Sequence, residues 1–109
     1  MKQPDRERSE HILAAAKEIE SFINGKTFED FKNDRLLQRG VEKDLEIIGE
    51  AANKLSEHTH KELPRIPWKA IIGMRNILVH VYFELDLETV WKTAKEDIPP
   101  LLENLKQLE

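Results

Sequence analysis

Cysteine is absent from the 109-residue sequence, which also holds only four glycines and a single tyrosine. Without cysteine the chain cannot form disulfides, thiolate metal sites or a cysteine nucleophile, so its chemistry must use other groups. No apolar run approaches the roughly 18 residues that a membrane-spanning helix needs. The opening MKQPDRERSE is too polar for a signal peptide. We therefore expect a cytoplasmic protein that does not enter a membrane.

The composition is that of an ordinary globular domain. Hydrophobic residues make up 39% of the chain and charged residues 35%, and this length is too short for two hydrophobic cores. We expect a single domain over residues 1–109. The net charge is -4, yet residues 58–80 sum to +3, from Lys61, Arg65, Lys69 and Arg75 against Glu62. This basic stretch is either a solvated helix surface or a functional patch.

Apolar residues recur at helical spacing in the first half of the chain. The pattern predicts a helix over residues 4–24, with Gly25 as a left-handed cap. Thr27 and Asp30 resemble a capping box that opens one short turn, and Asp34 is placed to cap a long helix to about residue 57.

The second half of the chain shows the same periodicity. Pro67 stands at the first turn of a third long helix, predicted over residues 67–80. Asp86 is a plausible cap for a fourth helix through residue 98, and Pro99 with Pro100 indicates a kink or a restart. No strand alternation or internal repeat occurs in the sequence. We therefore expect an all-α fold, an up-and-down bundle of four to five helices.

The stretch RNILVHVY, residues 75–82, places four polar groups around an apolar run. On an uninterrupted helix Arg75 and His80 lie five residues and about 140° apart, so they point to different sides, whereas Asn76 and His80 share a face. Arg75 meets His80 only if the helix loosens near His80, if the arginine side chain sweeps round, or if a second subunit brings its own copy. Two copies crossing at a two-fold axis would gather two arginines and two histidines.

Such a cleft suits cleavage of RNA. The 2′-hydroxyl must lose a proton and the leaving 5′-oxygen must gain one, and histidine serves as base or acid at cellular pH. Arginine stays charged and grips two phosphate oxygens at once. No metal is needed, and His58 with His60 alone is a weak metal signal. In the structural alternative, His80 is a helix cap or a core histidine with its hydrogen bonds satisfied. Arg75 is then a surface charge or an intersubunit ion pair, and Tyr82 a half-buried anchor.

The spacing Arg-x4-His-x-Tyr, formed by Arg75, His80 and Tyr82, resembles the signature of HepT-like proteins of the HEPN superfamily. The segments LEIIGEAANKLS, IPWKAIIGMRNILVHVYF and DLETVWKTAKEDIPPLLENL also resemble that family, in the same order along the chain. The resemblance implies a helical bundle of the HEPN type, a homodimer, and the toxin of a type VII toxin-antitoxin pair. Such a toxin is an endoribonuclease that needs no metal or other cofactor.

Position by position, the resemblance makes Arg75 and His80 the catalytic pair and Asn76 an auxiliary donor. Tyr82 matches the tyrosine that a nucleotidyltransferase antitoxin of the MntA type modifies with AMP. The expected partners are therefore an RNA substrate, that antitoxin and a second copy of the chain. A different interpretation is a non-catalytic helical adaptor, or a nucleotide-binding subunit, that pairs with a nucleotidyltransferase. A neighbouring gene for a small nucleotidyltransferase would favour the toxin.

Overall fold

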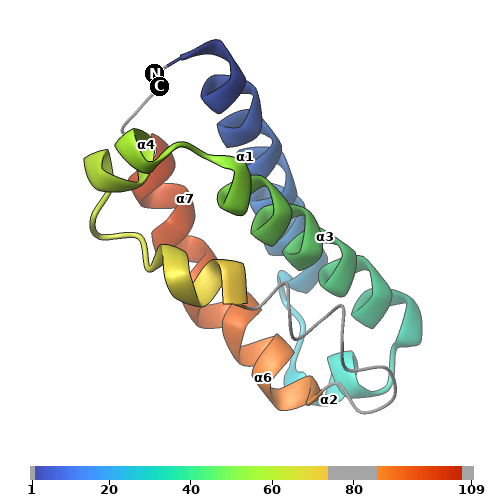
Figure 1. Cartoon of the computed structure of the whole chain (residues 1–109). Coiled ribbons are helices and arrows are strands. Elements are labelled where there is room, and N and C mark those ends of the chain that lie inside the picture. Colours follow the sequence, from blue (N-terminus) through green and yellow to red (C-terminus); the bar gives the residue numbers. More distant parts are fainter. Residues whose placement is uncertain (1, 74–85, 107–109) are drawn as a thin grey trace.

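The computed structural model describes residues 2–73 and 86–106, and every regular element within these ranges is helical (Figure 1). The prediction of an all-α bundle is therefore confirmed. The dimer stays a prediction. In chain order the helices are α1 (Gln3–Ile23), α2 (Phe28–Lys32), α3 (Arg35–Lys54), α4 (Glu57–Glu62), a helical segment over residues 68–73, α6 (Leu87–Lys92), the π-helical segment η1 (Thr93–Asp97) and α7 (Ile98–Lys106).

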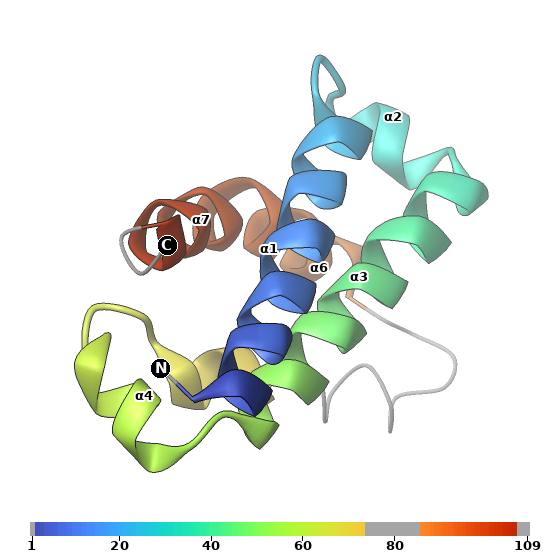
Figure 2. The ribbon, with the colours of Figure 1, turned by 90° about the horizontal axis from the view of Figure 1, so that it is seen from above.

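The centre of the bundle is the pair α1 and α3, which run antiparallel to each other (Figures 1 and 2). α7 packs on another side of α1. One close contact between the two central helices favours a glycine, because a Cβ added to Gly40 would lie 3.0 Å from the Phe22 ring and the ring would have to shift by a few tenths of an ångström. The core is made mainly of apolar side chains from α1, α3, α6 and α7, among them Ile12, Ile19, Val41, Ile48, Val90 and Leu101.

The corner between α1 and α3 follows the predicted cap chemistry. Gly25 has a φ of 73°, and the N–H of Lys26 donates to the carbonyl of Ile23, so the chain leaves α1 through a tight turn. Thr27 and Asp30 form the predicted capping box of α2. The Asp34 side chain accepts from the backbone N–H of Leu37 and caps α3. All three predictions are confirmed.

The end of α3 differs from the prediction. The helix stops at Lys54 rather than near residue 57, and Leu55 is extended. The Ser56 side chain accepts from the backbone N–H of Thr59 and begins a separate helix, α4. Six residues hold less than two turns, too few for an apolar stripe, so periodicity could not reveal this helix.

The last helical region is continuous from residue 87 to residue 106. No restart occurs at Pro99 and Pro100, because the helix widens to a π-turn before them, where the N–H of Ile98 donates to the carbonyl of Thr93. A proline has no N–H to donate, and a local change in hydrogen-bond register accommodates this loss. None of the helices in residues 2–73 and 86–106 combines the length and apolar character that a membrane span requires.

Candidate active site

The four residues predicted for the site are Arg75, Asn76, His80 and Tyr82, and all four lie outside the described residues. Their roles and mutual geometry therefore stay predictions. The structure describes the chain on both sides of them, up to Gly73 and again from residue 86.

Trp68 anchors the chain just upstream of the motif. Its side chain is 8% exposed, and its indole Nε1–H faces the carbonyl oxygens of His60 at 3.2 Å and Leu63 at 3.1 Å. The indole also lies against the His60 imidazole, with ring centroids 4.8 Å apart and planes inclined by 31°. Trp68 opens the helical segment 68–73, so these contacts fix the start of the helix predicted to carry the motif.

His60 in turn ties α4 to the end of α3. Its Nε2 lies 2.9 Å from the carbonyl oxygen of Ala52. A carbonyl only accepts, so Nε2 carries the proton in this contact. The other histidine of α4, His58, lies 2.9 Å from the Glu62 carboxylate through its own Nε2. The two histidines thus serve different partners, and the described part of the chain holds no cluster of three or more metal-binding side chains.

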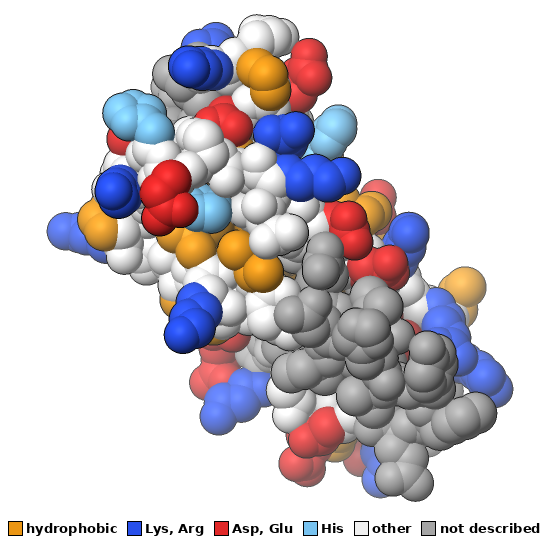
Figure 3. Space-filling view, viewed as in Figure 1, with side chains coloured by type: hydrophobic (Ala, Val, Ile, Leu, Met, Phe, Trp, Pro, Cys, Tyr) orange, Lys and Arg blue, Asp and Glu red, His pale blue; other side chains and the backbone are white. Residues whose placement is uncertain are grey.

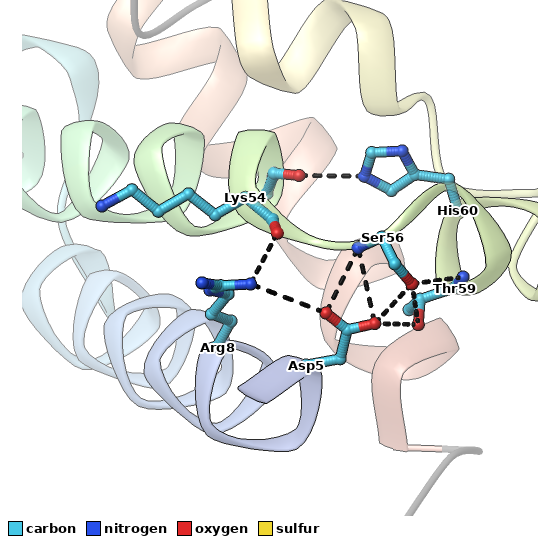
Figure 4. A network of polar contacts seen from close by, with 7 residues as sticks. Asp5, Arg8, Lys54, Ser56, Thr59 and His60 are labelled. Carbon is cyan, nitrogen blue, oxygen red and sulfur yellow. Dashed lines mark hydrogen bonds and ion pairs between the residues drawn. The ribbon is translucent and has the colours of Figure 1, made fainter. Parts of the chain in front are cut away.

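Asp5 fixes α4 to the beginning of α1 (Figure 4). This carboxylate is 5% exposed. It accepts from the hydroxyls of Ser56 at 2.5 Å and Thr59 at 2.7 Å, and from the backbone N–H of Ser56 at 3.2 Å. The Ser56 hydroxyl is the largest cause that lowers the pKa of Asp5, and these bonds together outweigh the opposing effect of burial. Asp5 is therefore an ionised acceptor inside the bundle.

Arg8 completes this network from the next turn of α1. Its guanidinium donates to the carbonyl of Lys54 at 2.7 Å and lies 3.8 Å from the Asp5 carboxylate. The last turn of α3 and the first turn of α4 are thus both held by α1 (Figure 4). Contacts therefore run without interruption from Asp5 through α4 to Trp68.

The downstream side of the motif is fixed at α6. Asp86 caps this helix by accepting from the backbone N–H groups of Glu88 and Thr89 and from the Thr89 hydroxyl at 2.7 Å. These hydrogen bonds, the hydroxyl first, lower the pKa of Asp86. One turn further, Trp91 packs on Phe31 of α2, with ring centroids 5.3 Å apart. The segment 74–85 therefore joins two anchored ends.

Asp44 is a buried acidic residue on α3. Its side chain lies among core residues and is 4% exposed, and within the described residues its Oδ2 has no hydrogen-bond partner. Burial raises the pKa of Asp44 to about 7, with a further contribution from a hydrogen bond and charge repulsion by Glu18. Its place three residues after Val41 and one before Leu45, in a stripe that is otherwise apolar, is the sequence signal for this residue.

The sequence matches a ribonuclease family model, and proteins named as probable or candidate ribonucleases, along nearly its whole length. The family model described as Ribonuclease HepT-like matches residues 12–108. A protein of Thermococcus cleftensis, named as a probable ribonuclease HepT, is 40% identical over 108 residues, which cover 99% of this chain and 98% of that protein. Two others have names that mark them as candidate RNases. One, from Methanocaldococcus jannaschii, is 37% identical over 83% of each chain.

A protein of Caldanaerobacter subterraneus, the second of these candidate RNases, is 38% identical to this chain. The match covers 99% of this chain and 96% of that protein. No solved structure matches the chain. The chain belongs to the HepT-like ribonuclease family. This membership confirms the family expected from the sequence, together with the enzyme class that the family carries.

Proposed function

We propose that this protein is a metal-independent endoribonuclease of the cytoplasm and the toxin of a toxin-antitoxin pair, formed by one domain over residues 1–109. The family match over residues 12–108 carries this proposal, because the matched region includes the whole stretch from Arg75 to Tyr82. The naming of similar proteins as ribonucleases supports the choice of RNA as substrate.

The proposed chemistry needs one proton acceptor, one proton donor and one fixed positive charge. His80 takes the proton from the 2′-hydroxyl, whose oxygen then attacks the neighbouring phosphorus. The bond to the 5′-oxygen breaks, and that oxygen receives a proton while a 2′,3′-cyclic phosphate is left on the other fragment. Arg75 stabilises the negative charge that builds up on the phosphoryl oxygens, and Asn76 adds a hydrogen-bond donor.

A homodimer supplies the second proton-transfer group. One chain provides a single copy of His80, whereas base and acid are both needed in the reaction. Two copies of the motif near a two-fold axis give two imidazoles and two guanidinium groups in one cleft. A dimer of closed symmetry is also the commonest oligomer. Sedimentation at micromolar concentration should show a dimer, and a monomer that cleaves RNA at full rate would contradict this part of the proposal.

The anchored chain on either side of segment 74–85 supports a catalytic role. Catalysis requires that reacting groups be held in place before the substrate arrives. The contacts from Asp5 to Trp68 on one side, and the Asp86 cap with Trp91 on the other, hold the described chain before residue 74 and after residue 85 to the core.

Tyr82 is the proposed point of control. A nucleotidyltransferase antitoxin would transfer AMP from ATP to the phenol oxygen and release pyrophosphate. The new phosphodiester carries a negative charge close in sequence to Arg75 and His80, and it competes with the scissile phosphate for the arginine. The adenosine also occupies space next to the catalytic pair. Modification should therefore inhibit cleavage while the protein stays folded.

The test uses purified, unmodified protein and total cellular RNA, with a chelator present. We expect cleavage by the native chain and almost none by the His80→Ala variant, because general base catalysis contributes about 10²–10⁴-fold. His11→Ala is the matched control, since His11 is exposed on α1 and outside the motif. Cleavage by His80→Ala at the native rate would refute the catalytic assignment.

A further inference from the structure

A surface hollow of about 580 Å³ lies between α4 and the helical segment 68–73. Its lining consists of Glu57, His60, Lys61, Pro64, Trp68, Lys69 and Ile72. On the face that carries these elements, Figure 3 shows apolar atoms bordered by basic and histidine side chains, with acidic side chains close by. The hollow thus combines an apolar floor with charged edges.

The charge of the hollow comes from two lysines. Lys61 on α4 and Lys69 on segment 68–73 are both exposed, and neither forms an ion pair with a described residue. Glu57 is the one acid among the lining residues. Two cationic side chains that line one hollow are suited to a phosphate-bearing chain, because backbone phosphates dominate the affinity of proteins for nucleic acids.

The walls of the hollow are rigid where they meet the core. Trp68 is held by the His60 and Leu63 carbonyls, and His60 by the carbonyl of Ala52. Trp68 is too deeply buried to stack on a base, so the hollow offers its lysine ammonium groups rather than an aromatic platform. Contacts of this kind position a nucleic acid without reading its sequence.

The hollow lies next to the predicted catalytic residues along the chain. On the helix predicted over residues 67–80, Arg75 and Asn76 follow Ile72 by three and four residues and share its face. Arg75 follows Lys69 by six residues, or about 9 Å of helix axis. Ile72 and Lys69 line the hollow. On that helix Arg75 would also stand about 120° around the axis from Lys69, so a strand that contacts both has to follow the helix surface past Ile72.

We propose that Lys61 and Lys69 form a phosphate-binding subsite for single-stranded RNA beside the cleavage site. The subsite rests on the proposed ribonuclease function and adds to it a surface that holds the flanking backbone. It explains why the basic excess of residues 58–80 lies in this part of an otherwise acidic chain. The lysines bind the substrate away from the scissile bond, so they affect binding of RNA and leave the chemical step unchanged.

The test compares the double variant Lys61→Gln/Lys69→Gln with the matched control Lys17→Gln/Lys32→Gln, which removes two exposed lysines from α1 and α2. Binding of a fluorescent single-stranded oligoribonucleotide of mixed sequence is measured by anisotropy in a His80→Ala background, where no cleavage occurs. We expect about tenfold weaker binding for the test variant than for the control at 0.1 M salt. The salt dependence of log K should become shallower by about 1.4, or about 0.7 for each phosphate that a lysine no longer neutralises.

Cleavage kinetics with His80 intact separate this subsite from the function on which it rests. The test variant should show a KM raised about tenfold with kcat within about twofold of the control. Equal binding and equal KM for test and control would overturn the subsite even if the native chain cleaves RNA. If the native chain cleaves no RNA, the proposed function fails, and the binding comparison still decides whether the hollow holds single-stranded RNA.

Discussion

Replacing Asp44 with asparagine should stabilise the fold at neutral and alkaline pH. Asp44 is 4% exposed and packs within the α1–α3 core, where an ionised carboxylate is poorly solvated. Burial, followed by the neighbouring Glu18 carboxyl, raises its pKa to about 7 from 3.8. Asparagine keeps the shape of the side chain and has no proton to lose. Its amide N–H can donate to Glu18, as the protonated carboxyl does.

The size and sign of the effect follow from the two pKa values of Asp44. Between pH 3.8 and about 7 the folded protein retains a proton that the unfolded chain has released. Native stability therefore falls as pH rises through this window. A separation of about three pKa units corresponds to at most about 4 kcal/mol at pH 7 and above. Domains of this size are stable by about 5–15 kcal/mol, so even half of this value would be easily measured.

Urea unfolding of both proteins between pH 4 and pH 8 checks this prediction. We expect nearly equal stability at pH 4 and an advantage of about 2–4 kcal/mol for Asp44→Asn at pH 8. Glu103→Gln, which removes an exposed carboxylate of α7, is the control and should change little. An advantage that does not grow with pH, or a loss of stability at pH 8, would show that Asp44 is not a destabilising buried acid.

Three further predictions concern the anchors and the control point. Asp5→Ala should destabilise the fold by about 2–4 kcal/mol at pH 7 by urea unfolding, because Ser56 and Thr59 lose an ionised acceptor. Since the pKa of Asp5 is lowered, this difference should shrink as pH falls below 4. Trp68→Phe removes the indole donor and should lower kcat for RNA cleavage. If kcat and the melting temperature are both unchanged, Trp68 does not anchor the chain in the way described. Tyr82→Phe should gain no AMP by mass spectrometry and should stay toxic when the antitoxin is co-expressed. If the antitoxin fully suppresses the toxicity of this variant, and the native chain carries no AMP adduct, then the antitoxin inhibits by binding alone.

Local chemistry predicts most of the helices correctly. The Thr27 capping box, the Asp34 cap and the turn at Gly25 depend on residues a few positions apart, and such signals are visible in the sequence. The helix α4 escapes prediction because its six residues are too few for an apolar stripe, and because the carboxylate that holds its cap Ser56 belongs to Asp5, 51 residues away. Nothing in a local pattern indicates which distant carboxylate will meet a given serine.

Some features of the candidate site can likewise be predicted from the sequence, and others cannot. The spacing of Arg75, His80 and Tyr82 is a local signal, and it indicates the family that the comparisons confirm. The anchor formed by Trp68 and His60 depends on how α4 folds back over the chain, so it is visible only in three dimensions. Asp44 shows an intermediate case, because its place in an apolar stripe is a signal but its partner Glu18 lies on another helix.

The most direct measurement of the central claim is single-turnover cleavage of a short oligoribonucleotide and of its 2′-deoxy analogue. The account predicts that the native chain cleaves the RNA to a 2′,3′-cyclic phosphate product and leaves the deoxy analogue intact, because the 2′-oxygen is the nucleophile. His80→Ala and Arg75→Ala should each lose at least about 10²-fold in rate, and the double variant should be hardly slower than either. Cleavage of the deoxy analogue, or native rates in the His80→Ala variant, would contradict the account.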